Sequence, residues 1–181
     1  MNVHLEPVFR ILLPELERAE IEYWVYGGIG IAACAGRFIR RNADVDIFVK
    51  DTAFEKTRSI LQDTCCQNLL KLKSKRLKRV GRPKLEVIGK GEILSVVPAY
   101  VEGKVVRFEF SNRPAEYPFQ MLERVERNIS SYRFFTPRDE YIKGLFITYL
   151  TLRPRVKKKP KIRTDAKVVL TPDEFRELMG E

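Results

Sequence analysis

The sequence has 181 residues, of which 44% are hydrophobic and 32% are charged, and this size and composition suit one globular domain. It is too short for a TIM barrel and has no run of about 20 apolar residues, so that fold and a membrane-spanning helix are excluded. The formal net charge of +10 suggests a polyanionic partner, either nucleic acid or nucleotide phosphates.

The first half of the chain predicts helices and strands in alternation. We expect a helix at 6–19 that Pro14 kinks, a strand at 21–26, a short helix at 29–35, a strand at 45–49 and a helix at 52–64. Apolar residues recur at helical spacing in the first and last of these segments, whereas the strands are rich in β-branched and aromatic residues.

The second half predicts more strands and then helices. We expect strands at 84–88, 93–97, 101–110 and 132–135, and helices at 119–127, at 136–152 with Thr136 as N-cap, and after Thr171, where Glu174 closes a capping box. The lysine-rich stretch at 157–161 is expected to be an exposed linker. The sequence therefore predicts a domain at 1–152, followed at 153–181 by a basic linker and a short C-terminal helix.

The cysteines and the N-terminal residues predict a cytoplasmic protein. Cys34, Cys65 and Cys66 are odd in number and form no CxxC pair, which is typical of a reducing compartment. Charged residues such as Glu6 and Arg10 interrupt the apolar residues at the N-terminus, so we expect no secretory signal.

Two short segments carry the whole positive surplus. Residues 71–84 hold eight of the 34 basic residues and 153–163 hold seven, and neither segment contains an acidic residue. The rest of the chain has 19 basic and 24 acidic residues and is therefore mildly acidic. These segments favour contacts with a polyanion, and we expect deletion of 153–163 to weaken binding of a polyanionic acceptor while leaving binding of the metal–nucleotide complex nearly intact.

A glycine pair and an acid pair carry the first chemical signal. Gly27 and Gly28 follow an expected strand and precede a helix, where backbone without Cβ atoms can approach a phosphate closely. Asp44 and Asp46 alternate with apolar residues, so both carboxylates share one face of a strand, at a spacing that suits Mg²⁺ and a nucleotide phosphate.

The segment YGGIGIAACAGRFIRRNADVDIFV resembles the signature of the nucleotidyltransferase superfamily related to DNA polymerase β, whose small members include antibiotic nucleotidyltransferases and minimal toxin–antitoxin domains. The resemblance implies an α/β (α+β) fold with a mixed β-sheet flanked by helices. It also implies transfer of a nucleoside monophosphate from a nucleoside triphosphate to a hydroxyl acceptor on a small molecule, a protein or RNA. Asp44 and Asp46 would take part in binding two Mg²⁺ (or Mn²⁺) ions, and pyrophosphate would leave.

The same resemblance implies a third carboxylate on a neighbouring strand. Glu86 and Glu109 are the candidates, and we favour Glu86, because a glutamate flanked by apolar residues needs a partner or a metal. Glu86 would complete the second metal site or accept the proton of the acceptor hydroxyl. Gly27 and Gly28 would hold the phosphates, as would the basic residues Arg40, Arg41 and Lys143.

Two alternatives remain open at this point. One is a nucleic-acid-binding module without catalysis that uses the basic segments 71–84 and 153–163. The other is a dinucleotide-binding protein, because Gly28, Gly30 and Ala33 fit the pattern G-x-G-x-x-A and Asp51 stands where a ribose-binding acid is expected.

Overall fold

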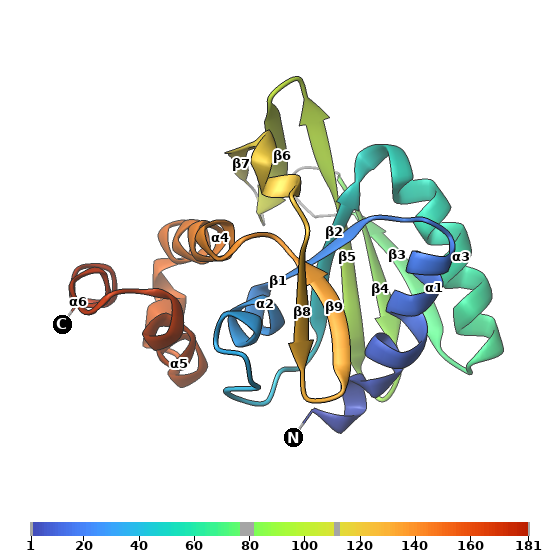
Figure 1. Ribbon diagram of the computed structural model, residues 1–181, viewed down its shortest axis with the longest axis horizontal. Coiled ribbons are helices and arrows are strands. Elements are labelled where there is room, and N and C mark those ends of the chain that lie inside the picture. Colours follow the sequence, from blue (N-terminus) through green and yellow to red (C-terminus); the bar gives the residue numbers. More distant parts are fainter. Residues whose placement is uncertain (1, 77–81, 111–112, 181) are drawn as a thin grey trace.

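A computed structural model describes residues 2–76, 82–110 and 113–180, and it is built around one mixed sheet (Figure 1). The hydrogen-bonded order β1-β2-β5-β4-β3 forms the body of the sheet, and β6 and β7 extend from the far end of β5. The bounds are β1 (Tyr23–Tyr26), β2 (Val45–Lys50), β3 (Lys71–Arg76), β4 (Pro83–Ile88), β5 (Glu92–Glu102), β6 (Val105–Phe110) and β7 (Arg113–Pro118). The pair β2–β5 is parallel and the other pairs are antiparallel.

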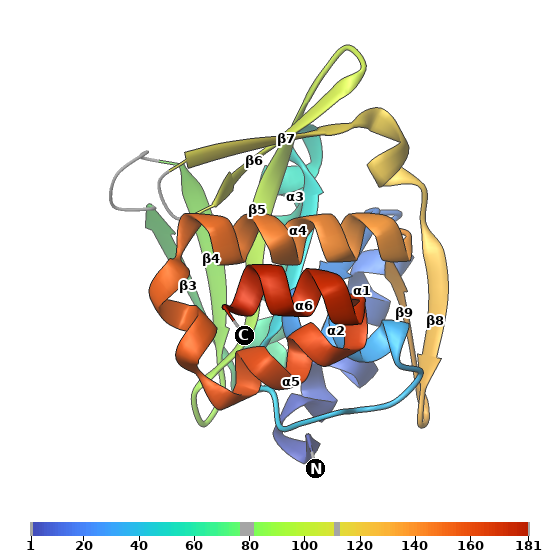
Figure 2. The ribbon, with the colours of Figure 1, turned by 90° about the vertical axis from the view of Figure 1, so that its left-hand side faces the viewer.

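Helices lie on both sides of this sheet (Figures 1 and 2). Their bounds are α1 (Leu13–Arg18), α2 (Gly27–Cys34), α3 (Phe54–Gln67), α4 (Asp139–Leu152), α5 (Pro160–Val169) and α6 (Pro172–Met179). Figure 2 shows α4, α5 and α6 as a layer in front of the sheet. A separate antiparallel pair, β8 (Val125–Ile129) and β9 (Tyr132–Thr136), packs beside β1.

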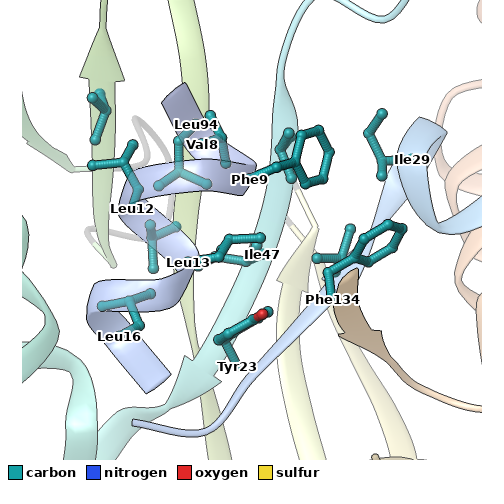
Figure 3. Close-up of a cluster of buried hydrophobic side chains, with 14 of the residues drawn as sticks. Val8, Phe9, Leu12, Leu13, Leu16, Tyr23, Ile29, Ile47, Leu94 and Phe134 are labelled. Carbon is teal, nitrogen blue, oxygen red and sulfur yellow. The ribbon is translucent and has the colours of Figure 1, made fainter. Parts of the chain in front are cut away.

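The main core lies between the sheet and the N-terminal helices. Val8, Leu12 and Leu16 come from the π-helical turn Val8–Leu12 and from α1, and they pack toward Ile47 and Leu94 of the sheet (Figure 3). Burying an apolar side chain of this size stabilises the fold by about 1.5–3 kcal/mol. Because side chains alternate along a strand, β2 turns Val45, Ile47 and Val49 into this core and turns Asp46 and Phe48 to the opposite face.

Two segments differ from the sequence expectation. The helix expected at 119–127 is wrong: residues Phe119–Leu122 form a short 3-10 helix and β8 follows. The indole of Trp24 donates a hydrogen bond to the carbonyl of Leu122 (3.2 Å), and Met121 and Leu122 are buried beside Trp24, so tertiary packing overrides the local helical pattern. The expected linker instead contains the 3-10 helix Pro154–Lys158 and α5, which begins at Pro160 and buries Ile162 and Ala166.

Other boundaries shift by a few residues. The two strands expected at 93–97 and 101–110 are the long strand β5 and the strand β6, with a hairpin turn at Gly103. The helix expected from Thr136 begins at Asp139, because Thr136 is buried at the end of β9 and its hydroxyl donates to the Pro137 carbonyl. The capping box of Thr171 and Glu174 is confirmed at the start of α6.

The dinucleotide-binding alternative is wrong. That fold needs a parallel β-α-β unit around the glycine-rich turn, but β1 and β2 are antiparallel. Gly30 has a packing role, since a Cβ atom there would lie 3.3 Å from the Val25 carbonyl oxygen. Asp51 begins a 3-10 helix after β2 and does not line the cavity described below.

Candidate active site

The glycine pair forms the tight junction between β1 and α2. Gly27 has φ +63°, and a Cβ atom added to it would lie 2.6 Å from Oδ2 of Asp46, so a side chain there meets both backbone strain and a carboxylate. A Cβ atom on Gly28 would overlap Oδ1 of Asn42 and Nη2 of Arg40. The absence of side chains at the pair therefore lets Asp46, Asn42 and Arg40 lie close to the N-terminus of α2. The free N–H groups at that terminus favour anions.

The two aspartates lie together next to this junction. Asp46 of β2 pairs in register with Tyr26 of β1 and with Ser95 of β5, and Asp44 lies just before the strand. Burial and the neighbouring Asp44 charge raise the pKa of Asp46 to about 7, against the opposing effect of the Lys84 charge. Two carboxylates held this close favour either a shared proton or a cation between them.

Both features line one cavity of about 370 Å³. Its sheet-side wall, which includes the loop before β2, is formed by Tyr26, Gly27, Gly28, Arg40, Asn42, Ala43, Asp44, Asp46, Lys84, Ser95 and Val97. Its opposite wall, called the helix wall below, comes mainly from α4 and α5. It contains Ile142, Leu145, Phe146, Tyr149, Arg153, Lys161, Ile162 and Asp165, and Ile31 of α2 lies between the two walls. Figure 2 shows α4 and α5 in front of α2.

A buried ion pair joins the two walls. Nε and Nη2 of Arg40 donate to the two carboxylate oxygens of Asp165 at 2.6 and 2.8 Å. Asp165 on α5 is 2% exposed, so the bidentate geometry fixes the guanidinium beside Gly28. Sequence reasoning missed Asp165, although it is the only acidic residue between Glu140 and Asp173 and stands next to a strongly basic segment.

Asn42 holds the loop that carries Arg40. The Asn42 backbone N–H donates to Oδ1 of Asn2 (2.9 Å), and its side-chain Nδ2 donates to the Arg40 carbonyl (3.2 Å). Asn42 lines the cavity and is 2% exposed, and its side-chain oxygen is buried with no hydrogen-bond partner among the described residues. A buried acceptor of this kind costs free energy until a donor reaches it, which is typical of a binding site.

The structure brings some of the other predicted residues to the cavity and not others. Arg40 lines it, whereas Arg41 is exposed outside its wall. Lys143 lies outside it too, and its Nζ is 2.6 Å from Oε1 of Glu174 on α6. The side chain of Glu109 lies outside the described residues, as do positions 77–81 of the first basic segment.

Glu86 lies two strands from Asp46 on the same face of the sheet. It pairs in register with Ser95 of β5, which in turn pairs with Asp46. The Glu86 carboxylate contacts the ammonium groups of Lys75 and Lys84, and although burial opposes ionisation, these contacts bring the pKa of Glu86 below its ordinary value. Glu86 does not line the cavity, but Lys84 does, with its Nζ 3.1 Å from Oε1 of Glu86.

The donor atoms at the cavity suit a magnesium ion that also binds phosphates. Within the described parts of the chain, no group of three or more His, Cys, Asp or Glu side chains is arranged to hold a metal. Mg²⁺ in nucleotide enzymes commonly takes only one or two protein carboxylates, and phosphate and water oxygens complete its coordination. Asp44 and Asp46 can supply those two carboxylates.

Comparisons with known proteins agree with this geometry. Residues 8–87 match the family model of aminoglycoside-2″-adenylyltransferase. The chain superposes on ANT(2″)-Ia in complex with adenylyl-2″-tobramycin with a TM-score of 0.66 and 17% identity, over 99% of this chain and 96% of that one. The chain therefore has the fold of the nucleotidyltransferases. Its predicted fold class is thereby confirmed, and the family match over residues 8–87 agrees with the predicted superfamily and enzyme class.

Two further solved structures share the nucleotidyltransferase fold. The lincosamide antibiotic adenylyltransferase LnuA, bound to lincomycin, has a TM-score of 0.59 and 17% identity over 87% of this chain and 91% of that one. A putative nucleotidyltransferase from Thermotoga maritima has a TM-score of 0.56 and 16% identity over 90% of this chain and 93% of that one. No curated protein matches the chain. Among the described residues, no helix has the length and hydrophobicity that crossing a membrane requires.

Proposed function

We propose that this nucleotidyltransferase moves a nucleoside monophosphate from a nucleoside triphosphate to a hydroxyl group of a small molecule, with Mg²⁺ held by Asp44 and Asp46. The observation that carries the proposal is that the Gly27–Gly28 junction and the two aspartates line one cavity. A phosphate-binding helix start and a metal-binding carboxylate pair are then within reach of a single triphosphate.

The chain's own groups would bind and orient the triphosphate. The backbone N–H groups at Gly27 and Gly28 would donate to phosphate oxygens, and the Arg40 guanidinium, fixed by Asp165, would face the same phosphates. When bound, Mg²⁺ neutralises the charge of the triphosphate and polarises the α-phosphate. The acceptor oxygen would attack the α-phosphorus, and the bond to pyrophosphate would break.

Glu86 remains our proposed third carboxylate, and Lys84 is the group through which it would act. The Glu86 carboxylate holds Lys84 at the cavity wall, where the ammonium charge lowers the pKa of Asp46. Glu86→Gln removes this anion, and we expect a fall in kcat together with a shift of the pH profile. Loss of activity without that shift would favour direct contact with a metal or with the acceptor hydroxyl.

The family match favours a small-molecule acceptor over a protein or RNA. The matching family model describes adenylyl transfer to an aminoglycoside, and LnuA is described as an antibiotic adenylyltransferase. ATP is therefore the first nucleotide to test. Transfer to RNA would instead be favoured by β3, a sheet-edge strand whose Lys71, Lys73, Lys75 and Arg76 are exposed, and RNA is included below for that reason.

The experiment measures pyrophosphate release and labelled product with each α-labelled nucleoside triphosphate and Mg²⁺. Acceptors are pools of small hydroxyl compounds, protein and total RNA, with the wild type beside Asp46→Ala. Asp51→Ala is the matched control, because Asp51 follows the same strand but lies outside the cavity. We expect product from the wild type and the control alone. No product that depends on Asp46, from any combination, would refute the proposal.

A further inference from the structure

The charge balance of the cavity limits which acceptor it can take. We infer that the acceptor in the proposed reaction, on which this inference rests, is an uncharged or anionic hydroxyl compound of the sugar or sugar-phosphate class, and not a polycation.

Each carboxylate that lines the cavity has a cation to balance it, either in the structure or in the proposed metal complex. Asp165 is held at two points by Arg40 and is 2% exposed, so its charge is already paired and is shielded from a second cation. Asp44 and Asp46 lie beside the phosphate-binding junction and would be occupied by Mg²⁺. Glu86 and Glu92 lie behind Lys84, which contacts both at 3.1 and 3.0 Å, and neither lines the cavity.

Two cations on the helix wall, in contrast, have no carboxylate partner in the part of the chain that the structure describes. Lys161 is exposed on the first turn of α5. Arg153 follows α4, and its guanidinium carbon lies 5.7 Å from the centre of the Tyr149 ring. Both line the cavity, so this wall presents positive charge toward any ligand.

A polycationic acceptor meets unfavourable electrostatics in such a site. Each ammonium group loses hydration on binding, and that cost is recovered only where a carboxylate or an oriented acceptor replaces the water. Facing Lys161 and Arg153, the ammonium groups would instead meet like charge. The neutral surface that remains, which includes Tyr26, Tyr149 and Val97, suits the apolar face and the hydroxyl groups of a sugar ring.

The acceptor of this chain would then differ in charge from the ligand of one of its structural neighbours. ANT(2″)-Ia was solved with adenylyl-2″-tobramycin, a derivative of a polycationic aminoglycoside. At 17% identity the shared fold places the cavity but does not determine the side chains on its helix wall. In this chain Lys161 and Arg153 occupy that wall.

The test titrates tobramycin into the nucleotide-free protein in saturating Mg²⁺ by calorimetry and compares three proteins. They are the wild type, the double variant Arg153→Glu/Lys161→Glu in the cavity, and the double variant Arg155→Glu/Lys158→Glu. Arg155 and Lys158 are exposed in the same basic segment but do not line the cavity, so both variants change the net charge equally. Circular dichroism confirms that each variant is folded, and N-acetylated tobramycin serves as the uncharged ligand.

We expect a dissociation constant above about 1 mM for wild type and tobramycin, with no preference over the N-acetylated form, and at least a tenfold gain for the cavity variant alone. Micromolar binding of tobramycin to the wild type would overturn the inference. So would a cavity variant with no gain, or an equal gain in the outside variant. Because no nucleotide is present, this result is independent of the proposed transfer reaction, which fails separately if the wild type forms no product.

Discussion

The two walls of the cavity are built in different ways. The sheet-side wall takes its chemical groups largely from residues 26–46, where Gly27, Gly28, Asp44 and Asp46 meet because β1 and β2 are neighbours. The helix wall takes its groups from 142–165, much later in the chain, and reaches the site because α5 packs on α2. The first wall carries the groups expected for transfer, and the second sets the charge that a ligand meets.

Because the two walls come from distant parts of the chain, chemistry and selectivity are separable in this molecule. Gly27 and Asp46 lie so close together that a Cβ atom on Gly27 would be 2.6 Å from Oδ2 of Asp46. The helix wall, in contrast, is attached to the site through one buried ion pair, Arg40–Asp165, and through apolar packing of α5. Changes in the sheet wall should therefore abolish the reaction, whereas changes in the helix wall should alter ligand binding and stability.

The largest expected effect is that of Asp46→Asn on activity. We expect product formation to fall at least about 10³-fold, because the amide removes a metal-binding charge. The same variant should be more stable than the wild type at pH 8 when no metal or nucleotide is present. Asp51→Asn is the control, and it should change neither activity nor stability appreciably, since Asp51 lies outside the cavity.

The sign of that stability effect follows from the pKa of Asp46. Burial and Asp44 raise it to about 7 in the folded protein, whereas the unfolded chain ionises this carboxyl near pH 4. Between these values the folded state holds the extra proton, so wild-type stability falls as the pH rises from about 4 to about 7. Thermal unfolding should show Asp46→Asn melting higher at pH 8 and no higher at pH 4. An unchanged difference across this range would contradict the assignment.

On the helix wall, the largest expected effect is that of Asp165→Asn. Removal of one partner of a buried ion pair costs about 3–5 kcal/mol of unfolding free energy, because the other charge remains buried. The nucleotide dissociation constant should also rise, since Arg40 is no longer fixed beside Gly28. Urea unfolding and nucleotide titration measure the two effects.

Asp173→Asn is the matched control, because Asp173 pairs with Arg176 at the surface of α6. The double variant Arg40→Met/Asp165→Leu separates stability from binding. It should recover much of the lost stability, as apolar replacements of buried ion pairs often do, without recovering nucleotide binding. If Asp165→Asn leaves both stability and nucleotide affinity unchanged, the ion pair does not join the two walls.

A smaller effect is expected for Gly27→Ala at the junction. A side chain at φ +63° costs about 1–3 kcal/mol, and its Cβ would displace Asp46 from its present position. Activity should therefore fall more than stability does. Gly103→Ala is the control, because Gly103 also has positive φ but no atom lies within 4 Å of its added Cβ. Equal losses of activity in the two variants would mean that strain alone is responsible.

The sheet wall could be predicted from the sequence because its signals are local. Alternation placed Asp46 opposite Val45 and Ile47, and the glycine pair marked the turn into α2, so the fold class followed from about 30 residues. Periodicity failed at 119–127, where burial of Met121 and Leu122 beside Trp24 selects a 3-10 turn and a strand over a helix.

The helix wall could not be predicted, because its position depends on contacts that no local pattern encodes. The two basic segments look equivalent in sequence. In the structure, the segment 71–84 contributes β3 to the edge of the sheet, with its lysines exposed. The other places Arg153 and Lys161 in the cavity. Deletion of 153–163 should therefore impair the nucleotide site as well, in contrast to the expectation from charge alone.

The smallest effect is expected for substitution of Lys143, which the nucleotidyltransferase resemblance predicted to lie near the nucleotide. In the structure its ammonium group contacts Glu174 on α6, outside the cavity lining. This contact is partly exposed, and salt and solvent screen such pairs, so Lys143→Met should change the nucleotide dissociation constant less than twofold. Glu174→Gln, which removes the same pair from the other side, should behave alike. A rise in the dissociation constant for Lys143→Met alone would show that the lysine leaves Glu174 for a phosphate when nucleotide binds, and that α4 contributes to chemistry as well as to selectivity.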